Sequence, residues 1–273
     1  MTVILSCSNL KGGVGKTALA VQFSAYCGLN GKKTLLIDLD PQTNATLSCV
    51  DIEEWSKWAK DKGTVADLLG ARAHTSAEGK KKSINDIIWP NVFKNVDLLP
   101  SHLDLFTIDL DLAATTAREF KLRKAITPIK DNYDVIVCDC PPNLTIPTQN
   151  ALAASTHFVV PISLDYLSGL GVGLLLNRVI ELCGDLEHDI VNSGLVISRV
   201  GRPAQHREET ETALRETFGD SVLDQFLTER VAVSEAAAAH KSIFEMTDTK
   251  AKDEFSAVST ELCRRLGLNS ENT

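Results

Sequence analysis

Lys11-Gly12-Gly13-Val14-Gly15-Lys16-Thr17 is the stretch that decides the fold, because it joins an apolar run at 3–5 to a helix-like pattern that begins at Lys16. The three glycines let successive backbone N–H groups turn inward around an anion, and the following helix adds its positive dipole end. Lys16 can reach the β- and γ-phosphates of a nucleotide, and the Thr17 hydroxyl can ligate Mg²⁺. An incidental glycine-rich turn is disfavoured by the strand before the stretch and the helix after it. The stretch predicts a loop that binds phosphate through Gly12, Gly13, Val14, Gly15, Lys16 and Thr17.

Short apolar runs alternate with longer helix-like segments along the chain. The strand-like runs lie at 3–5, 34–37, 96–99, 135–137, 158–160 and 195–197, and the helix-like segments at 16–29, about 105–130, 167–183, 203–218 and 248–266. This alternation predicts an α/β fold, doubly wound, with a mostly parallel sheet and helices on both faces. We expect one domain over residues 1–273, with a helical elaboration at about 48–90.

Composition narrows the class of protein further. The chain has 273 residues, 44% of them hydrophobic, and a net charge of −8, which argues against a globally basic nucleic-acid binder but allows a local basic patch. No apolar run is long enough to span a membrane, and the first residues lack a basic leader, so we expect a cytoplasmic protein. The seven cysteines are scattered, which is typical of buried, reduced thiols and makes a structural metal site improbable.

Two aspartate-bearing segments follow later strand-like runs. Asp38-Leu39-Asp40-Pro41-Gln42-Thr43-Asn44 follows the second run, and Asp139-Cys140-Pro141-Pro142 follows the fourth. Taken alone, each aspartate is most simply a carboxylate that caps a turn. Their order after a phosphate loop favours catalysis instead, because a carboxylate at the end of a buried strand is costly unless a cation compensates it.

The loop has a second lysine, Lys11, and Leu10 stands where the usual G-x-x-x-x-G-K-[ST] pattern begins with glycine. In this two-lysine form the chain resembles the ParA/MinD (SIMIBI-class) family of deviant Walker A ATPases, closest to its ParA-type members, over about residues 2–266. The resemblance implies that Lys11 reaches the nucleotide of the other subunit across a dimer. Ala18, where the family often has threonine, is expected near the α-phosphate.

The resemblance also assigns roles to the aspartates and names the cofactors. It implies a P-loop NTPase fold, with ATP/ADP and Mg²⁺ as cofactors and a weak, Mg-dependent ATP hydrolase activity coupled to dimerisation. Asp40 matches the carboxylate that positions the attacking water, so the expected catalytic residues are Lys11, Lys16 and Asp40. The expected metal residues are Thr17, Asp38 and Asp139. Adenine contacts are the weakest inference, and they point to 198–199 and a turn at 230–233.

Partners follow from the same resemblance. ParA-type proteins form ATP-dependent sandwich homodimers, bind DNA non-specifically, associate with the nucleoid, and segregate a cargo when a ParB-like activator, often basic, stimulates hydrolysis. The candidates for DNA contact are Arg199, Arg202, Arg207, Arg230 and Lys241, with a weaker set at Lys80–Lys82. Only one arginine remains near the family's usual basic turn, beside Glu229, so each candidate taken singly is also readily explained as a solvated surface charge.

Three alternatives remain open at this point. A MinD-like positioning ATPase would need a basic amphipathic C-terminal helix, but residues 245–273 carry a charge of −2 and Leu262, Leu266 and Leu268 are typical of packing positions, so we expect no membrane contact. A metabolic or cofactor-assembly ATPase on the same fold would need cluster cysteines or a substrate segment. A regulatory module without hydrolysis would not need Asp40 and both lysines. The sequence does not name the cargo or the activating partner.

Overall fold

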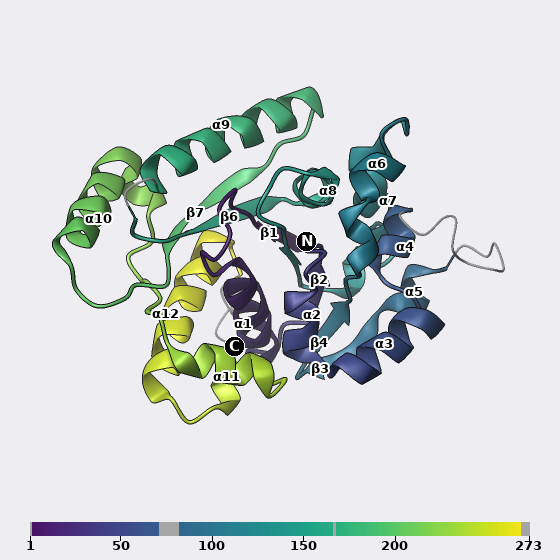
Figure 1. Cartoon of the computed structure of the whole chain (residues 1–273), viewed down its shortest axis with the longest axis horizontal. Coiled ribbons are helices and arrows are strands. Elements are labelled where there is room, and N and C mark those ends of the chain that lie inside the picture. The colour runs from purple at the N-terminus through teal and green to yellow at the C-terminus, as the bar shows by residue number, and fades with distance from the viewer. Residues whose placement is uncertain (1, 71–81, 166–167, 269–273) are drawn as a thin grey trace.

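The computed structural model describes residues 2–70, 82–165 and 168–268 (Figure 1). Its centre is one sheet in the order β3-β4-β2-β5-β1-β6-β7, parallel throughout except for the antiparallel pair β3 and β4. The strands are β1 (Val3–Cys7), β2 (Thr34–Asp38), β3 (Trp89–Phe93), β4 (Val96–Leu99), β5 (Val135–Asp139), β6 (His157–Ile162) and β7 (Val191–Ile197). The predicted doubly wound α/β class is confirmed.

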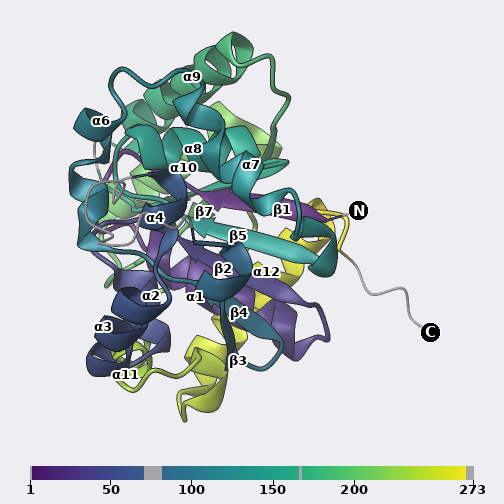
Figure 2. The same ribbon diagram turned by 90° about the vertical axis from the view of Figure 1, so that its right-hand side faces the viewer.

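Alternating side chains of the strands enter the cores on the two faces of the sheet. In β1, Leu5 packs in the core beneath α1 (Lys16–Leu29), whereas Ile4 packs in the core on the opposite face. Figure 2 shows α1 and α12 (Thr249–Arg265) on one side of the sheet, and α7 (Lys121–Ile126), α8 (Ile146–Ala154) and α9 (Ser168–Asp185) on the other. Burial on both faces explains why these strands are almost continuously apolar.

All six predicted strands are present, but β3 was not predicted. Its five residues include Pro90 and Asn91, and its side chains are mostly not buried. Proline cannot donate a ladder hydrogen bond and is tolerated at a sheet edge, which is where β3 lies. The strand escapes a search for buried apolar runs because only its last residue, Phe93, is buried.

The single helix predicted at about 105–130 is wrong. The segment contains two short α-helices, α6 (Ile108–Asp111) and α7, with 3₁₀ turns η1 (Leu103–Phe106), η2 (Arg118–Phe120) and η3 (Lys130–Asn132) around them. Ala117 has a positive φ of 52°, which interrupts a regular helix. Conversely, α8 and α11 (Val231–Ala238) were not predicted, because both are short and rich in alanine rather than strongly periodic.

Short helices follow β2. They are α2 (Asn44–Cys49), α3 (Ile52–Asp61), α4 (Val65–Leu69) and α5 (Ile84–Ile87), and residues 89–90, predicted as the end of a helical elaboration, belong to β3. Trp58 joins α3 to the sheet edge, since its ring stacks on Trp89 with centroids 4.3 Å apart and its Nε1 donates to the carbonyl of Ile87. Lys80 and Lys81 of the weaker basic set lie outside the described residues.

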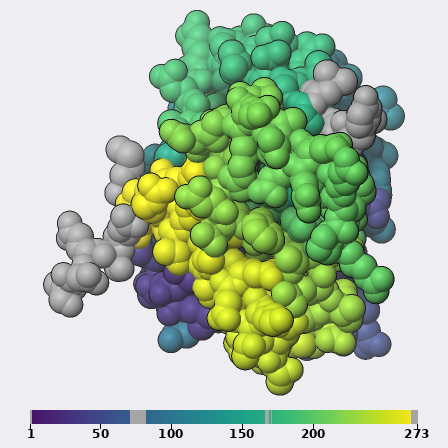
Figure 3. Space-filling view, turned by 90° about the vertical axis from the view of Figure 1, so that its left-hand side faces the viewer, coloured from purple at the N-terminus to yellow at the C-terminus, as the bar shows by residue number. Residues whose placement is uncertain are grey.

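The last third of the chain covers the face of the molecule drawn in Figure 3, where α10 (Gln205–Phe218, green) lies beside α11 and α12 (yellow-green to yellow). Leu262 and Leu266 are buried beneath this face, and Leu268 packs against the same core, as the sequence predicted. Among the described residues, no helix combines the length and the apolar character needed to cross a bilayer.

Candidate nucleotide site

The phosphate loop leaves the carboxyl end of β1 and ends at the first turn of α1. Gly13 and Gly15 have φ values of 74° and 85°, a region that favours glycine, so the loop conformation depends on these two positions. The loop is held from outside by the residues after β7: Arg199 donates to the carbonyl of Gly13 over 2.7 Å, and Ser198 donates to that of Val14. With these carbonyls engaged outward, the loop keeps its amides available for an anion.

Lys16 lies at the base of this loop and is almost fully buried, with 6% of its surface exposed. Its Nζ donates to the carbonyl of Lys11 over 2.9 Å. Burial lowers the pKa of Lys16, whereas the carboxylate of Asp139 raises it. A buried ammonium of this kind is favourable for binding a phosphate, because a charge-assisted hydrogen bond is strong where water is excluded.

Asp139 ends β5 directly below the loop and is completely buried. Within the described part of the chain, neither of its carboxylate oxygens accepts a hydrogen bond of ordinary geometry. Burial, and then the charge of Asp38, raises the pKa of Asp139 well above its usual value, and the nearby Thr17 hydroxyl and Lys16 act in the opposite direction. Two orphaned buried carboxylate oxygens beside a hydroxyl are the donor set that Mg²⁺ prefers, so the residues present fit this cation.

Asp38 is the register partner of Asp139 on the neighbouring strand β2, but it has a different environment. One of its oxygens accepts from the amide of Asp40, and the other accepts from both the amide and the hydroxyl of Thr46, at 2.7–3.0 Å. Burial raises the pKa of Asp38 to about 7, although the hydrogen bonds from Thr46 lower it. Asp38 therefore fixes the segment that follows β2. Of the two strand-end aspartates expected near Mg²⁺, only Asp139 has oxygens without a hydrogen bond among the described residues.

Asp40 is held by its backbone as well as by its side chain. Its carboxylate accepts from the amide of Gln42 over 2.9 Å, and its carbonyl accepts from the Ser101 hydroxyl over 2.7 Å. The amide of Ser101 donates to the Thr46 hydroxyl, which closes a fully buried network between the end of β4 and the segment 38–46. Thr46 and Ser101 were not among the predicted site residues, because an isolated hydroxyl in a sequence gives no sign of which backbone group it binds.

Lys11 extends away from the phosphate cavity rather than into it. Its Nζ forms a short ion pair with Asp165, whose carboxylate also accepts from the Ser163 hydroxyl, and about half of the Lys11 side chain is exposed. Asn9 supports this part of the loop, since its side chain accepts from the amide of Lys11 and donates to the carbonyl of Pro161. Lys11 and Lys16 therefore occupy separate environments.

A cavity of about 800 Å³ opens beside the loop, wide enough for a nucleotide. Gly12, Lys16, Thr17, Ala18 and Asp40 line one side of it, and the residues of the other side are Ser198, Arg199, Leu227, Thr228, Glu229, Arg230, Val231, Val233, Ser234, Ala237 and Phe255. The segments predicted for adenine contact thus line the same cavity. The turn predicted at 230–233 is wrong, because Arg230 is the N-cap residue of α11 and the helix starts at Val231.

The predicted DNA contacts do not form one cluster. Arg199 pairs with Glu229, and Arg230 pairs with Glu254 and Asp248, so both line the cavity with their charges compensated. Arg202, Arg207 and Lys241 lie away from the cavity lining, on the loop before α10, on α10 and after α11, and Arg207 donates to the carbonyl of Arg202. Arg202 and Lys241 are exposed, while Arg207 is partly buried.

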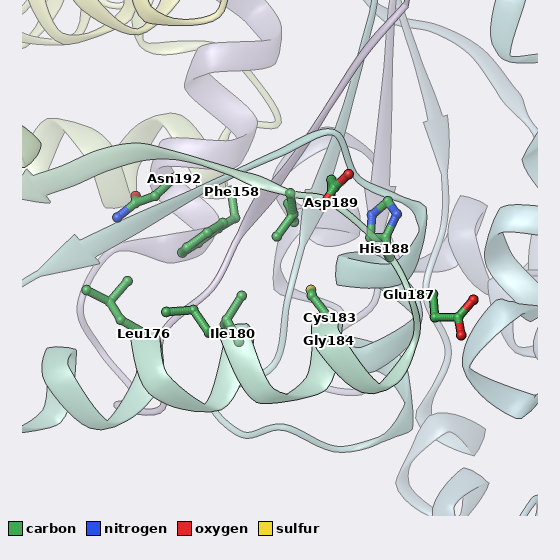
Figure 4. A pocket seen from close by; sticks show the side chains of 11 residues that line it. Phe158, Leu176, Ile180, Cys183, Gly184, Glu187, His188, Asp189 and Asn192 are labelled. Carbon is green, nitrogen blue, oxygen red and sulfur yellow. The ribbon is translucent and has the colours of Figure 1, made fainter.

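A second cavity, of about 440 Å³, lies between α9 and strands β6 and β7 and shares no lining residue with the first (Figure 4). Leu176, Ile180 and Phe158 give it an apolar wall, and Glu187, His188 and Asp189 lie at one end. It contains none of the motif residues. Of these two cavities, only the first is lined by residues of the phosphate loop and by Asp40.

Comparison with known proteins gives the family. A family model described as an AAA domain matches residues 1–191. The chromosome-partitioning ATPase Soj of Treponema pallidum is 34% identical over 229 residues, which covers 84% of this chain and 83% of Soj. The chain belongs to the ParA/MinD family of partition ATPases. The predicted family resemblance is confirmed, and ATP hydrolysis is the activity of this family.

Solved structures show the ParA-like P-loop NTPase fold. A McdA–ATP complex from Cyanothece has a TM-score of 0.80 and 17% identity, covering 100% of this chain and 99% of McdA. Cobyrinic acid a,c-diamide synthase from Mycobacterium smegmatis, with bound ADP and magnesium, has a TM-score of 0.77 and 22% identity, covering 98% and 96% of the two chains. An ATP-binding McdA and a cobyrinic acid a,c-diamide synthase share this fold, so the fold alone does not identify a function. The sequence relatives place this chain among the partition ATPases.

Proposed function

We propose that the chain is a ParA-type ATPase that hydrolyses ATP with Mg²⁺ at the phosphate loop, forms a sandwich dimer with ATP, binds DNA non-specifically in that state, and segregates or positions a cargo. The observation that carries the proposal is the carboxylate of Asp139, which is fully buried near Thr17 and Lys16 and accepts no hydrogen bond of ordinary geometry among the described residues. Thr17 and Lys16 in turn line the nucleotide-sized cavity. A protein tolerates such a carboxylate when a bound cation compensates it.

Different residues at the nucleotide site have different roles in the proposed reaction. The amides of Gly12–Thr17 and the ammonium of Lys16 bind the β- and γ-phosphates, and Thr17 and Asp139 hold Mg²⁺, with Asp38 as a supporting residue. Bound Mg²⁺ neutralises charge on the phosphates. Asp40 orients the attacking water, and its backbone is fixed for this role by Ser101 and the Asp38–Thr46 pair.

Dimerisation would complete this site through Lys11. In the single chain Lys11 is paired with Asp165, so it does not contribute to its own cavity. We propose that in the ATP-bound dimer Lys11 leaves this pair and neutralises phosphate charge in the partner subunit, which makes hydrolysis depend on association. Lys11→Ala should then bind ATP with normal affinity but fail to hydrolyse it.

DNA binding is assigned to the residues outside the cavity. Arg202, Arg207 and Lys241 have no carboxylate partner among the described ion pairs, whereas Arg199 and Arg230 do. A dimer would present two copies of this weakly basic set, and non-specific affinity grows with the number of phosphates contacted. The net charge of −8 implies strong salt sensitivity and favours a basic activating protein, and DNA binding implies association with the nucleoid. The cargo, whether plasmid, chromosome or protein assembly, is left open.

The test is a DNA mobility-shift assay with ATP, ADP and no nucleotide at several salt concentrations, alongside a Mg²⁺-dependent hydrolysis assay. We expect a salt-sensitive shift with ATP only, loss of both activities in Lys16→Ala, and weaker DNA binding with normal hydrolysis in Arg202→Ala/Lys241→Ala. Equal DNA binding in all three nucleotide states would contradict the proposed switch, and undiminished hydrolysis in Lys16→Ala would contradict the assigned site.

A further inference from the structure

The segment between β4 and α7 is apolar on two faces. Leu105, Ile108 and Leu112 are buried in the core beneath the sheet. Leu103, Phe106 and Leu110 alternate with them and are 52%, 57% and 80% exposed. Large apolar side chains that gather on the exposed side of a segment often mark an interaction site, so this exposed side is a candidate interface. We call Leu103, Phe106 and Leu110 the apolar stripe.

The apolar stripe lies at the rim of the molecule, where Figures 1 and 2 both place α6. Negative charge surrounds it: Asp104, Asp109 and Asp111 lie between its members or beside them, and residues 102–112 contain no lysine or arginine. A partner that covers the stripe must therefore supply apolar side chains flanked by positive charge. A second copy of this chain is disfavoured as the occupant, because symmetric pairing would oppose the three aspartates to their own copies.

The same segment contacts both aspartate-bearing loops of the nucleotide site. At its start, Ser101 donates to the carbonyl of Asp40 over 2.7 Å and its amide binds Thr46. Within α6, Asp109 accepts from the amide of Ile146 over 2.8 Å, at the beginning of α8 and seven residues after Asp139. Residues 101–109 are thus hydrogen-bonded to the segment after β2 and to the segment after β5.

We propose that the apolar stripe is the docking surface for a basic amphipathic segment of an activating protein, and that docking adjusts Asp40 through Ser101 and the loop after Asp139 through Asp109. The proposal rests on the proposed function, because it takes Asp40 and Asp139 as the groups that act on water and metal. The aspartates around the stripe account for the positive charge of the partner. A partner bound there would change the rate of hydrolysis without entering the nucleotide cavity.

The test uses a labelled helical peptide of leucines and lysines as the probe, with a leucine–glutamate peptide of the same pattern as its control. Fluorescence anisotropy reports binding, and ATP turnover with and without peptide reports activation. The variant Phe106→Ser/Leu110→Ser removes the centre of the stripe. Leu174→Ser/Ile180→Ser is the matched control, because these two apolar side chains of α9 are 55% and 70% exposed and lie outside the stripe. Circular dichroism verifies that each variant folds.

We expect the Leu/Lys peptide to bind and to stimulate turnover in the parent and in the α9 control, with affinity at least tenfold lower in Phe106→Ser/Leu110→Ser and reduced in Asp111→Lys. The Leu/Glu peptide should not bind. Equal peptide affinity for all variants, or loss only in the α9 control, would overturn the proposal. So would loss of the ATP-dependent dimer in Phe106→Ser/Leu110→Ser, which would make the stripe a self-interface.

The two readouts separate this inference from the proposed function. If the parent protein binds the peptide at the stripe but hydrolyses no ATP in any condition, the proposed function fails and the docking surface stands. If the parent hydrolyses ATP in a Lys16-dependent manner while the peptide binds without regard to the stripe, the docking surface fails and the proposed function stands.

Discussion

Asp38 and Asp139 face each other in register at the ends of two adjacent parallel strands, yet their surroundings differ completely. Asp38 accepts three hydrogen bonds from the segment that follows it, whereas Asp139 accepts none of ordinary geometry among the described residues. Both are fully buried, and burial raises the pKa of each. With equal burial, the two aspartates differ in their hydrogen bonds: Asp38 holds the segment that carries Asp40, whereas the oxygens of Asp139 are those that we propose to hold a cation.

The largest expected effect is that of Asp139→Asn. Removing the unpaired charge should lower Mg²⁺-dependent ATP hydrolysis on the order of 100-fold, because the carboxylate that holds the cation is lost. The same change should raise the free energy of unfolding of the nucleotide-free protein at pH 8 by roughly 0.5–2 kcal/mol, as is usual when a destabilising functional group is removed. Steady-state kinetics and urea denaturation measure the two effects. A lower free energy of unfolding in Asp139→Asn would show that the Asp139 carboxylate makes interactions that stabilise the fold.

Asp38→Ala should lower the free energy of unfolding, whereas Asp139→Asn should raise it. The amides of Asp40 and Thr46 and the Thr46 hydroxyl would lose their acceptor in a buried site, which costs about 1–3 kcal/mol of unfolding free energy. Urea denaturation at pH 8 compares it directly with Asp139→Asn. If both substitutions stabilise the protein, the hydrogen bonds of Asp38 do not outweigh the cost of its burial, and the contrast between the two aspartates is lost.

A smaller effect is expected from Ser101→Ala, which removes the hydroxyl that holds the Asp40 carbonyl. One lost hydrogen bond of about 1 kcal/mol should lower kcat roughly fivefold, with the KM for ATP unchanged, because phosphate contacts are not affected. Ser259→Ala is the matched control, since this buried hydroxyl of α12 has no partner among the described residues. A rise in KM, or an equal loss in the control, would argue that Ser101 does not position Asp40.

A further effect is expected on the pH dependence of stability. The pKa of Asp38 is raised from its ordinary 3.8 to about 7, and that of Asp139 is raised as well, so between about pH 4 and 7 the folded protein holds protons that the unfolded chain has released. Stability without nucleotide should therefore fall as pH rises through this window. Thermal melting of the parent and of Asp139→Asn, from pH 5 to 8, isolates the contribution of Asp139. If the melting temperature of the parent falls no more steeply with pH than that of Asp139→Asn, this contribution of Asp139 is ruled out.

The sequence predicted the fold well because its strands are buried on both faces and its phosphate loop has a specific spacing. It failed where conformation depends on tertiary context: the edge strand β3 carries Pro90, and the helix expected at 105–130 is broken where Ala117 takes a positive φ. In the site, motif residues could be named from their order in the chain. The partners of these residues could not, since Thr46 at Asp38, Ser101 at Asp40 and Asp165 at Lys11 reach them only through folding.

The most direct test of the account is calorimetric titration of ATP into the parent and into Asp139→Asn, with and without Mg²⁺. If Asp139 helps to hold the cation, Mg²⁺ should tighten ATP binding in the parent, and this gain should disappear in Asp139→Asn while its affinity for metal-free ATP is preserved. An equal gain from Mg²⁺ in both proteins would contradict the assignment of Asp139 and the division of labour between the two aspartates.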